Sequence, residues 1–290
     1  MSTMRFNYRS QAIGKYVDVT VVYPTDNLSY YDPTEQKKHH ILPNEKKKMP
    51  YKQGMKFQTI YLIHGGGDDD SLTYRYTNAE RYAQENNVML VTPNVANSFG
   101  VNTNYGVEYS TFITQELPKV VQSLFASSEK REDNFIVGYA MGGNVALANA
   151  LIHPEVYNTC VDISGGIGMT VNTDTLKREL DSDHFKNNFP LYNSTFGKSE
   201  MLEESKHNLY RIAKKNLDEG IQVPDFHIIV GSDEFIFDRV KADADTMKEI
   251  GYKVEYTCYD GYDHDFVFWD MILKKLFDEI LPLKREPIYK

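Results

Sequence analysis

A strand–turn–helix segment in the middle of the chain constrains the fold more than any other feature. Residues 134–144 read Asn-Phe-Ile-Val-Gly-Tyr-Ala-Met-Gly-Gly-Asn, an apolar run followed by a glycine-rich turn and small residues. Ala146 and Ala150 follow four positions apart, so they share one face of a helix that can pack closely on a sheet. The segment therefore predicts a buried strand that turns sharply into a helix.

The glycines of this turn match the nucleophile elbow G-x-S-x-G of the α/β-hydrolases. Gly138 and Gly142 occupy the two glycine positions, and Ala140 stands where the pattern has serine. A phosphate-binding loop is the alternative, but the turn has no P-loop lysine and does not match G-x-G-x-x-G. We therefore predict an elbow whose nucleophile position, Ala140, has no atom that can attack a carbonyl.

Apolar runs alternate with helical patterns along the chain, which is typical of an α/β protein with a mainly parallel central sheet and helices on both faces. The predicted strands are 17–23, 57–63, 88–91, 134–137, 159–164, 226–230 and 254–259. The predicted helices are 74–85, 107–125, 141–152, 202–217, 238–250 and 265–280. We expect one domain over residues 1–290, with a polar insertion at about 24–56 and a cap-like segment at about 170–200.

The composition limits the classes of partner and the compartment. The net charge of −9 argues against a general affinity for nucleic acid or an anionic membrane. The chain has no stretch long and apolar enough to span a bilayer and begins without a signal-peptide pattern, so we expect a cytoplasmic location unless a secretion signal has been trimmed. Cys160 and Cys258 lie in strand-like segments and are expected to be buried free thiols.

A histidine and a carboxylate follow the elbow in the chain order of serine hydrolases, which is nucleophile, acid, histidine. His264 follows the strand 254–259 and is the expected base. Glu234 and Asp233 both follow the strand 226–230. Spacing from the strand-ending glycine favours Glu234 as the acid, whereas Asp233 is the commoner residue type for that role. Neighbours on a turn point apart, so only one of the two is expected to face the histidine.

A glycine run after the strand 57–63 has the position of an oxyanion-hole loop. It reads His64-Gly-Gly-Gly, and glycines allow backbone N–H groups to approach a developing oxyanion. We expect the N–H groups of Gly66 and of Met141, the residue after the nucleophile position, to be the donors. A plain tight turn is the alternative.

Several motifs occur in consistent order over most of the chain. They are Tyr61-Leu-Ile-His-Gly, Tyr76-Thr-Asn-Ala-Glu-Arg-Tyr-Ala, Thr92-Pro-Asn, Phe112-Ile-Thr-Gln-Glu-Leu-Pro, Gly138-Tyr-Ala-Met-Gly-Gly and His264-Asp-Phe-Val-Phe-Trp. Together they resemble the esterase D superfamily of α/β-hydrolases, especially its tributyrin-esterase and feruloyl-esterase branch. The chain departs from that pattern at Ala140, at Asp233-Glu234, where Glu-Asp is more usual, and in the insertion at 24–56.

The resemblance implies hydrolysis of carboxylic esters through an acyl-enzyme, without a metal or an organic cofactor. We expect a small-molecule or oligosaccharide ester as substrate, namely a feruloyl, hydroxycinnamoyl or acetyl ester of plant cell-wall carbohydrate. An S-formylglutathione-type thioesterase uses the same machinery and stays open, as does a non-catalytic relative that binds esters or sugars. Because Ala140 lacks a nucleophile, which we interpret first as an engineered serine-to-alanine change, this chain is expected to bind esters and barely turn them over.

Overall fold

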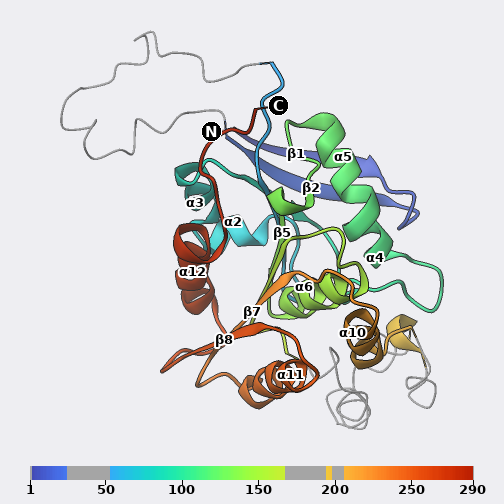
Figure 1. The fold of residues 1–290 in the computed structure, drawn as a ribbon. Helices are drawn as coiled ribbons and strands as arrows, with labels where there is room; N and C mark the ends of the chain where they lie inside the picture. The colour runs from blue at the N-terminus through green and yellow to red at the C-terminus, as the bar shows by residue number, and fades with distance from the viewer. Residues whose placement is uncertain (1, 25–52, 167–193, 198–205, 290) are drawn as a thin grey trace.

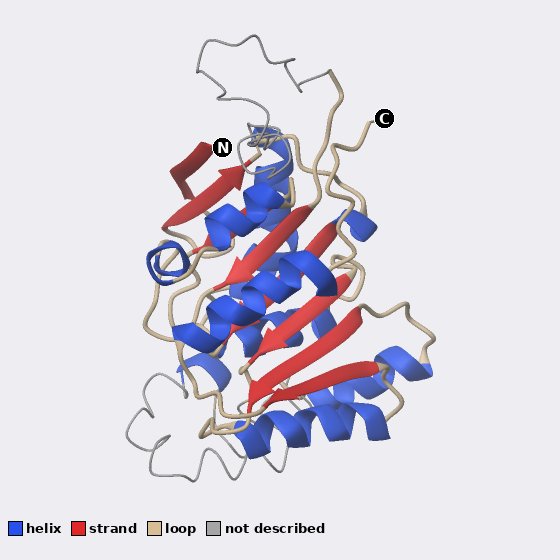
Figure 2. Cartoon of the chain, turned by 90° about the vertical axis from the view of Figure 1, so that its left-hand side faces the viewer, coloured by secondary structure: helices blue, strands red, loops and turns tan. Residues whose placement is uncertain are grey.

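The computed structural model describes residues 2–24, 53–166, 194–197 and 206–289. In this part of the chain an eight-stranded sheet runs through the molecule in the order β1-β2-β4-β3-β5-β6-β7-β8. The pairs β1–β2 and β2–β4 are antiparallel, and every other neighbouring pair is parallel. Figure 2 shows the strands as one twisted layer between helices. The prediction of a mainly parallel sheet covered by helices is confirmed.

The strands are β1 (Ser2–Arg9), β2 (Tyr16–Tyr23), β3 (Thr59–Ile63), β4 (Met89–Pro93), β5 (Asn134–Tyr139), β6 (Thr159–Ile163), β7 (Asp225–Gly231) and β8 (Val254–Tyr259). The α-helices are α2 (Leu72–Tyr76), α3 (Ala79–Glu85), α4 (Tyr109–Thr111), α5 (Leu117–Leu124), α6 (Met141–Ile152), α10 (Leu209–Asp218), α11 (Phe237–Glu249) and α12 (Phe266–Lys275). A π-helical turn joins α4 to α5 at Phe112–Glu116, and a second follows α12 at Leu276–Ile280.

Two hydrophobic clusters cover the two faces of the sheet. Helices α3 and α12 pack on one face, and α5, α6, α10 and α11 pack on the other (Figure 1). In β5, Phe135 and Val137 belong to the cluster of α12, whereas Ile136 belongs to the cluster of α6. A strand buried on both faces needs apolar side chains at every position, which explains the continuous apolar runs of the central strands.

Several features differ from the sequence predictions. The predicted helices 107–125 and 265–280 each contain a π-helical turn, and in the described residues the predicted helix 202–217 begins only at Leu209. The predicted helix 74–85 is two helices, because Thr77 adopts an extended conformation and Asn78 bonds to Asp270 through its backbone and side-chain nitrogens. The edge strand β1 was not predicted, because its mostly exposed residues lack an apolar pattern. Cys258 is exposed rather than buried, because it lies on β8, the other edge strand of the sheet.

Most of the predicted insertion at 24–56 and of the cap-like segment at 170–200 lies outside the described residues. The lysine-rich part of the insertion falls within residues 25–52, for which no structure is described. Within the described ranges, none of the helices has the length and apolar character needed to cross a bilayer.

Candidate active site

The predicted site residues gather at the carboxyl edge of the parallel strands. The glycine loop follows β3, Ala140 follows β5, Glu234 follows β7 and His264 follows β8. The carboxyl ends of parallel strands meet at one edge of a sheet, and this edge is where open α/β folds place their ligand sites. Topology alone therefore brings residues that are 200 positions apart in the sequence to one place.

The backbone at Ala140 has the conformation of a nucleophile elbow. Its φ of 51° and ψ of −127° lie outside the regions that alanine ordinarily occupies. Such a conformation costs on the order of 1–3 kcal/mol and persists only where the surroundings impose it. Here the Ala140 N–H donates to the Ile163 carbonyl at 2.9 Å, and the Ala140 carbonyl accepts from the Gly143 N–H at 2.9 Å. The chain keeps the strained turn although its central side chain is a methyl group.

The glycines on either side of the elbow are required by packing. A Cβ on Gly138 would lie 2.0 Å from the Gly142 carbonyl oxygen, and one on Gly142 would lie 2.1 Å from the Ile63 carbonyl oxygen. Both approaches involve backbone atoms, which cannot move aside without displacing β3 or α6. The elbow therefore depends on both glycines for the close contact between the strand and the helix.

Glu234, not Asp233, faces the histidine. The Glu234 Oε2 atom lies 2.7 Å from His264 Nδ1, and Glu234 is only 4% exposed. Its other oxygen, Oε1, accepts hydrogen bonds from the Gly231 N–H and the Ser164 hydroxyl, both at 2.7 Å. Asp233 is exposed and accepts from the neighbouring Ser232 hydroxyl at 2.7 Å. The two neighbours on the turn thus point apart. The sequence left open which of them is the acid, and the geometry favours Glu234.

His64 holds the glycine loop in place. Its Nε2 atom accepts from the Val95 N–H at 3.0 Å, so its proton is on Nδ1, which lies 2.8 Å from the Gly65 carbonyl oxygen. Burial lowers the pKa of His64, which keeps the ring neutral in this arrangement. We interpret His64 as a structural support of the loop rather than as a group that takes part in proton transfer.

The two residues expected to supply the oxyanion donors, Gly66 and Met141, lie next to each other. A Cβ on Gly66 would be 3.9 Å from the Met141 Cβ. Met141 is the first residue of α6, so its N–H has no acceptor within the helix and lies at the positive end of the helix dipole. The adjacent Gly67 N–H donates to Asn97 Oδ1 at 2.7 Å, which fixes the loop. Asn97 was not predicted, because nothing in the sequence near it indicates a partner 30 residues away.

Aromatic side chains surround His264. The His264 ring contacts Trp269 edge-on, with centroids 5.0 Å apart, and Trp269 stacks on Tyr139, the residue before Ala140, at 4.8 Å. On the outer side, Phe235 meets His264 with centroids 4.9 Å apart and is itself 76% exposed. An apolar surface therefore reaches solvent directly beside the histidine.

A buried carboxylate, Asp162, lies under the elbow. Asp162 on β6 is fully buried, and within the described residues its oxygens make no hydrogen bond of good geometry, the Gly165 N–H being a weak donor to the carboxyl group. A Cβ on Gly143 or on Gly165 would lie 2.2 Å from Asp162 Oδ1, so this oxygen packs against both backbones. Burial, together with the nearby Asp243 carboxylate, raises the pKa of Asp162 well above its ordinary value.

We expect Asp162→Asn to stabilise the protein, and more strongly at pH 8 than at pH 5. Because the folded pKa is raised, the folded state keeps a proton that the unfolded chain releases above about pH 4, so stability falls as pH rises through this window. Asparagine mimics the neutral acid and removes this dependence, for a gain of about 1–3 kcal/mol at pH 8. Urea unfolding at both pH values measures the change in the free energy of unfolding. Asp218→Asn, at an exposed position, is the charge-matched control. Equal gains at the two pH values would contradict the interpretation.

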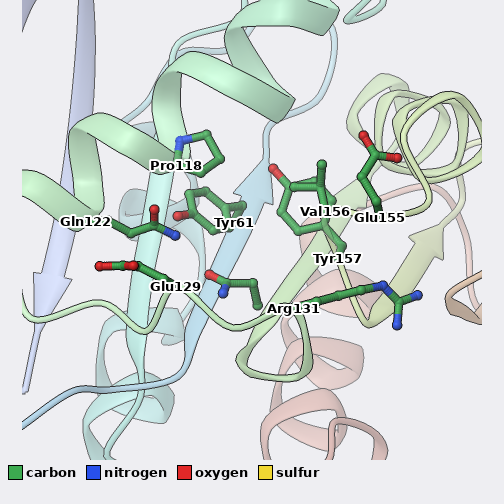
Figure 3. A pocket seen from close by; sticks show the side chains of 9 residues that line it. Tyr61, Pro118, Gln122, Glu129, Arg131, Glu155, Val156 and Tyr157 are labelled. Atoms are coloured by element: carbon green, nitrogen blue, oxygen red, sulfur yellow. The ribbon is translucent and has the colours of Figure 1, made fainter. Parts of the chain in front are cut away.

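A pocket of about 220 Å³ lies at the opposite edge of the sheet (Figure 3). It opens between α5 and the amino ends of β5 and β6, and Tyr61, Gln122, Arg131 and Tyr157 are among its lining residues. None of the predicted site residues borders it, so it is separate from the carboxyl-edge site. In the part of the chain that the structure describes, no group of three His, Cys, Asp or Glu side chains is arranged to hold a metal ion.

The sheet order, the elbow and the Glu234–His264 pair define an α/β-hydrolase. Two solved structures from Staphylococcus aureus share the fold over nearly their whole length. FphF, a fluorophosphonate-binding serine hydrolase, has a TM-score of 0.76 at 26% identity, covering 97% of this chain and 98% of its own. The S-formylglutathione hydrolase FrmB has a TM-score of 0.74 at 26% identity and the same coverage.

Sequence comparison gives the family. The family model named Esterase matches residues 41–270, which is most of the chain, and the chain therefore belongs to the Esterase family. An acetyl esterase from Caldicellulosiruptor saccharolyticus is 22% identical over 279 residues, which cover 96% of this chain and 97% of that protein. The resemblance to esterases found in the sequence motifs is thus confirmed at the level of the family.

Proposed function

We propose that this site is built to hydrolyse carboxylic esters through a serine at position 140, and that this chain, with Ala140, retains the site without its nucleophile. The observation that carries the proposal is the backbone of Ala140 at φ 51° and ψ −127°. A strained turn of this kind serves to present a nucleophile at the top of the sheet. The strained turn occurs in the same molecule as a hydrogen-bonded Glu234–His264 pair. This combination supports a hydrolase site that lacks the hydroxyl oxygen of the nucleophile.

The chemistry follows from the geometry once a serine occupies position 140. His264 Nε2 takes the serine proton as Oγ forms a bond to the ester carbonyl carbon, and the carbonyl oxygen becomes an oxyanion that accepts from the Gly66 and Met141 N–H groups. Collapse of this intermediate breaks the bond to the alcohol oxygen, to which His264 returns the proton. Water then repeats the sequence on the acyl-enzyme and releases the acid.

We propose acetyl esters of carbohydrate as the substrate class. The full-length likeness to an acetyl esterase supports a short acyl group. Hydroxycinnamoyl esters are the second candidate, because Phe235 is exposed beside His264 and offers an aromatic face to a phenolic ring. The likeness to an S-formylglutathione hydrolase supports a formyl thioester as a third candidate. The chain with Ala140 is proposed to bind these compounds without appreciable turnover.

A substrate panel on the Ala140→Ser variant tests the proposal. The panel contains an acetylated xylo-oligosaccharide, methyl ferulate and S-formylglutathione, with the unchanged chain measured in parallel. We expect the variant to act on the acetylated oligosaccharide with the highest kcat/KM and the unchanged chain to be inactive on all three. A folded variant that is inert on the whole panel would overturn the assignment and leave an ester- or sugar-binding protein as the better account.

A further inference from the structure

Ser164, the first residue after β6, has two features that a plain loop residue does not need. It is completely buried and has a φ of 58°, in the left-handed region that serine seldom adopts. Its hydroxyl lies 2.7 Å from Glu234 Oε1 and 3.2 Å from the indole Nε1 of Trp269. A residue held against its conformational preference by two buried hydrogen bonds indicates that those bonds matter to the fold or to the site.

The donor and acceptor of each hydrogen bond from Trp269 through Ser164 to Glu234 can be assigned, because an N–H group can only donate. The Trp269 indole N–H has no acceptor function, so the Ser164 hydroxyl must accept from it. The single proton of the hydroxyl is then directed to Glu234 Oε1. The Gly231 N–H donates to the same oxygen at 2.7 Å. Glu234 Oε1 therefore receives two hydrogen bonds, which fix the orientation of the carboxylate group.

The other oxygen of Glu234, Oε2, determines which ring nitrogen of His264 carries the proton. With Oε1 occupied by two donors, Oε2 is the acceptor for His264 Nδ1 at 2.7 Å. A carboxylate oxygen that accepts at this distance holds the imidazole proton on Nδ1 and leaves the Nε2 lone pair free to accept a proton. This is the tautomer that a general base needs in order to deprotonate a nucleophile.

We propose that Ser164, oriented by Trp269, is a positioning residue that fixes Glu234 with Oε2 toward His264 and so holds His264 in the Nδ1–H tautomer. Glutamate has one more rotatable bond than aspartate, so it needs a second anchor to hold one oxygen toward the histidine. Ser164 and Gly231 together supply that anchor. Trp269 is itself held between the rings of Tyr139 and His264, which ties the anchor to the elbow strand.

Imidazole ¹⁵N and ¹H NMR of His264 tests the proposal in the chain with Ala140, without any need for turnover. We expect the unchanged chain to show the Nδ1–H tautomer with a strongly downfield Nδ1 proton. Ser164→Gly removes the hydroxyl and relieves the positive φ, so it should fold while losing that proton signal and showing mixed tautomers. Trp269→Phe should weaken the signal in the same direction. Ser232→Ala is the matched control, because its hydroxyl bonds to Asp233 on the same turn.

The consequence for catalysis rests on the proposed function and is measured in the Ala140→Ser background. Ser164→Gly is expected to lower kcat about 100-fold with little change in KM, because a misplaced base slows the chemical step rather than binding. If Ala140→Ser is inactive but the NMR signature depends on Ser164, the proposed function fails and the positioning role stands. If Ser164→Gly leaves both the His264 signals and kcat as they were, the positioning role is wrong.

Discussion

Ala140→Ser is expected to raise kcat on the preferred ester by on the order of 10⁴- to 10⁶-fold over the unchanged chain. In serine proteases, loss of the nucleophile alone removes nearly all of the catalysis that the whole triad provides. Here Glu234 and His264 are already paired, and Gly66 and Met141 already lie close together, at the same edge of the sheet as Ala140. On the proposed function, a serine oxygen at position 140 supplies the nucleophile that the methyl group cannot.

The variant is expected to fold like the unchanged chain, because serine adds one atom and the strained backbone is already present with alanine. The double variant Ala140→Ser/His264→Ala is the control, and its kcat should return to the level of the unchanged chain. Mass spectrometry after treatment with a fluorophosphonate should show one adduct on Ser at position 140 in the single variant and none in the unchanged chain. A rise in activity that survives removal of His264 would mean that the elbow is not the reacting site.

The elbow and its helix could be predicted closely from the sequence because they depend on local requirements. The predicted helix 141–152 coincides with α6, since the glycines and alanines that define it also dictate how it packs. The position of His264 was equally accessible, because it follows a recognisable strand in a known chain order. The structure places this histidine against a carboxylate, as the order nucleophile, acid, histidine requires.

The identity of the acid and the contacts around it could not be predicted from the sequence, because they depend on segments that are far apart in the chain. Which of Asp233 and Glu234 faces His264 is decided by the turn after β7, where the Asp233 N–H donates to the Tyr262 carbonyl at 3.0 Å. No local pattern carries that information. Ser164 could have been noticed as a polar residue at the carboxyl end of the strand next to β5, and Trp269 as the single tryptophan of the chain. Their bond to each other spans 105 residues and only the fold reveals it.

In the Ala140→Ser background, Glu234→Gln is expected to lower kcat about 10⁴-fold, whereas Asp233→Asn should change it by less than about threefold. Glutamine keeps the shape of Glu234, and its carbonyl oxygen is expected to stay with the two donors, Gly231 N–H and Ser164 hydroxyl. Its NH₂ group then faces His264 Nδ1, where both partners would be donors unless the histidine moves its proton to Nε2. That tautomer cannot accept the proton of the nucleophile.

The pair is a matched test, because both changes replace a carboxylate by its amide at adjacent positions on one turn. Each removes one negative charge near His264, so a general electrostatic effect would lower both rates, by less for the exposed Asp233 than for the buried Glu234. The direct bond to His264 Nδ1 belongs to Glu234 alone, whereas Asp233 is exposed and accepts from the Ser232 hydroxyl. Steady-state kcat and KM on the preferred ester measure the difference. A large loss with Asp233→Asn and a small one with Glu234→Gln would reverse the assignment of the acid and would mean that the turn rearranges when the substrate binds.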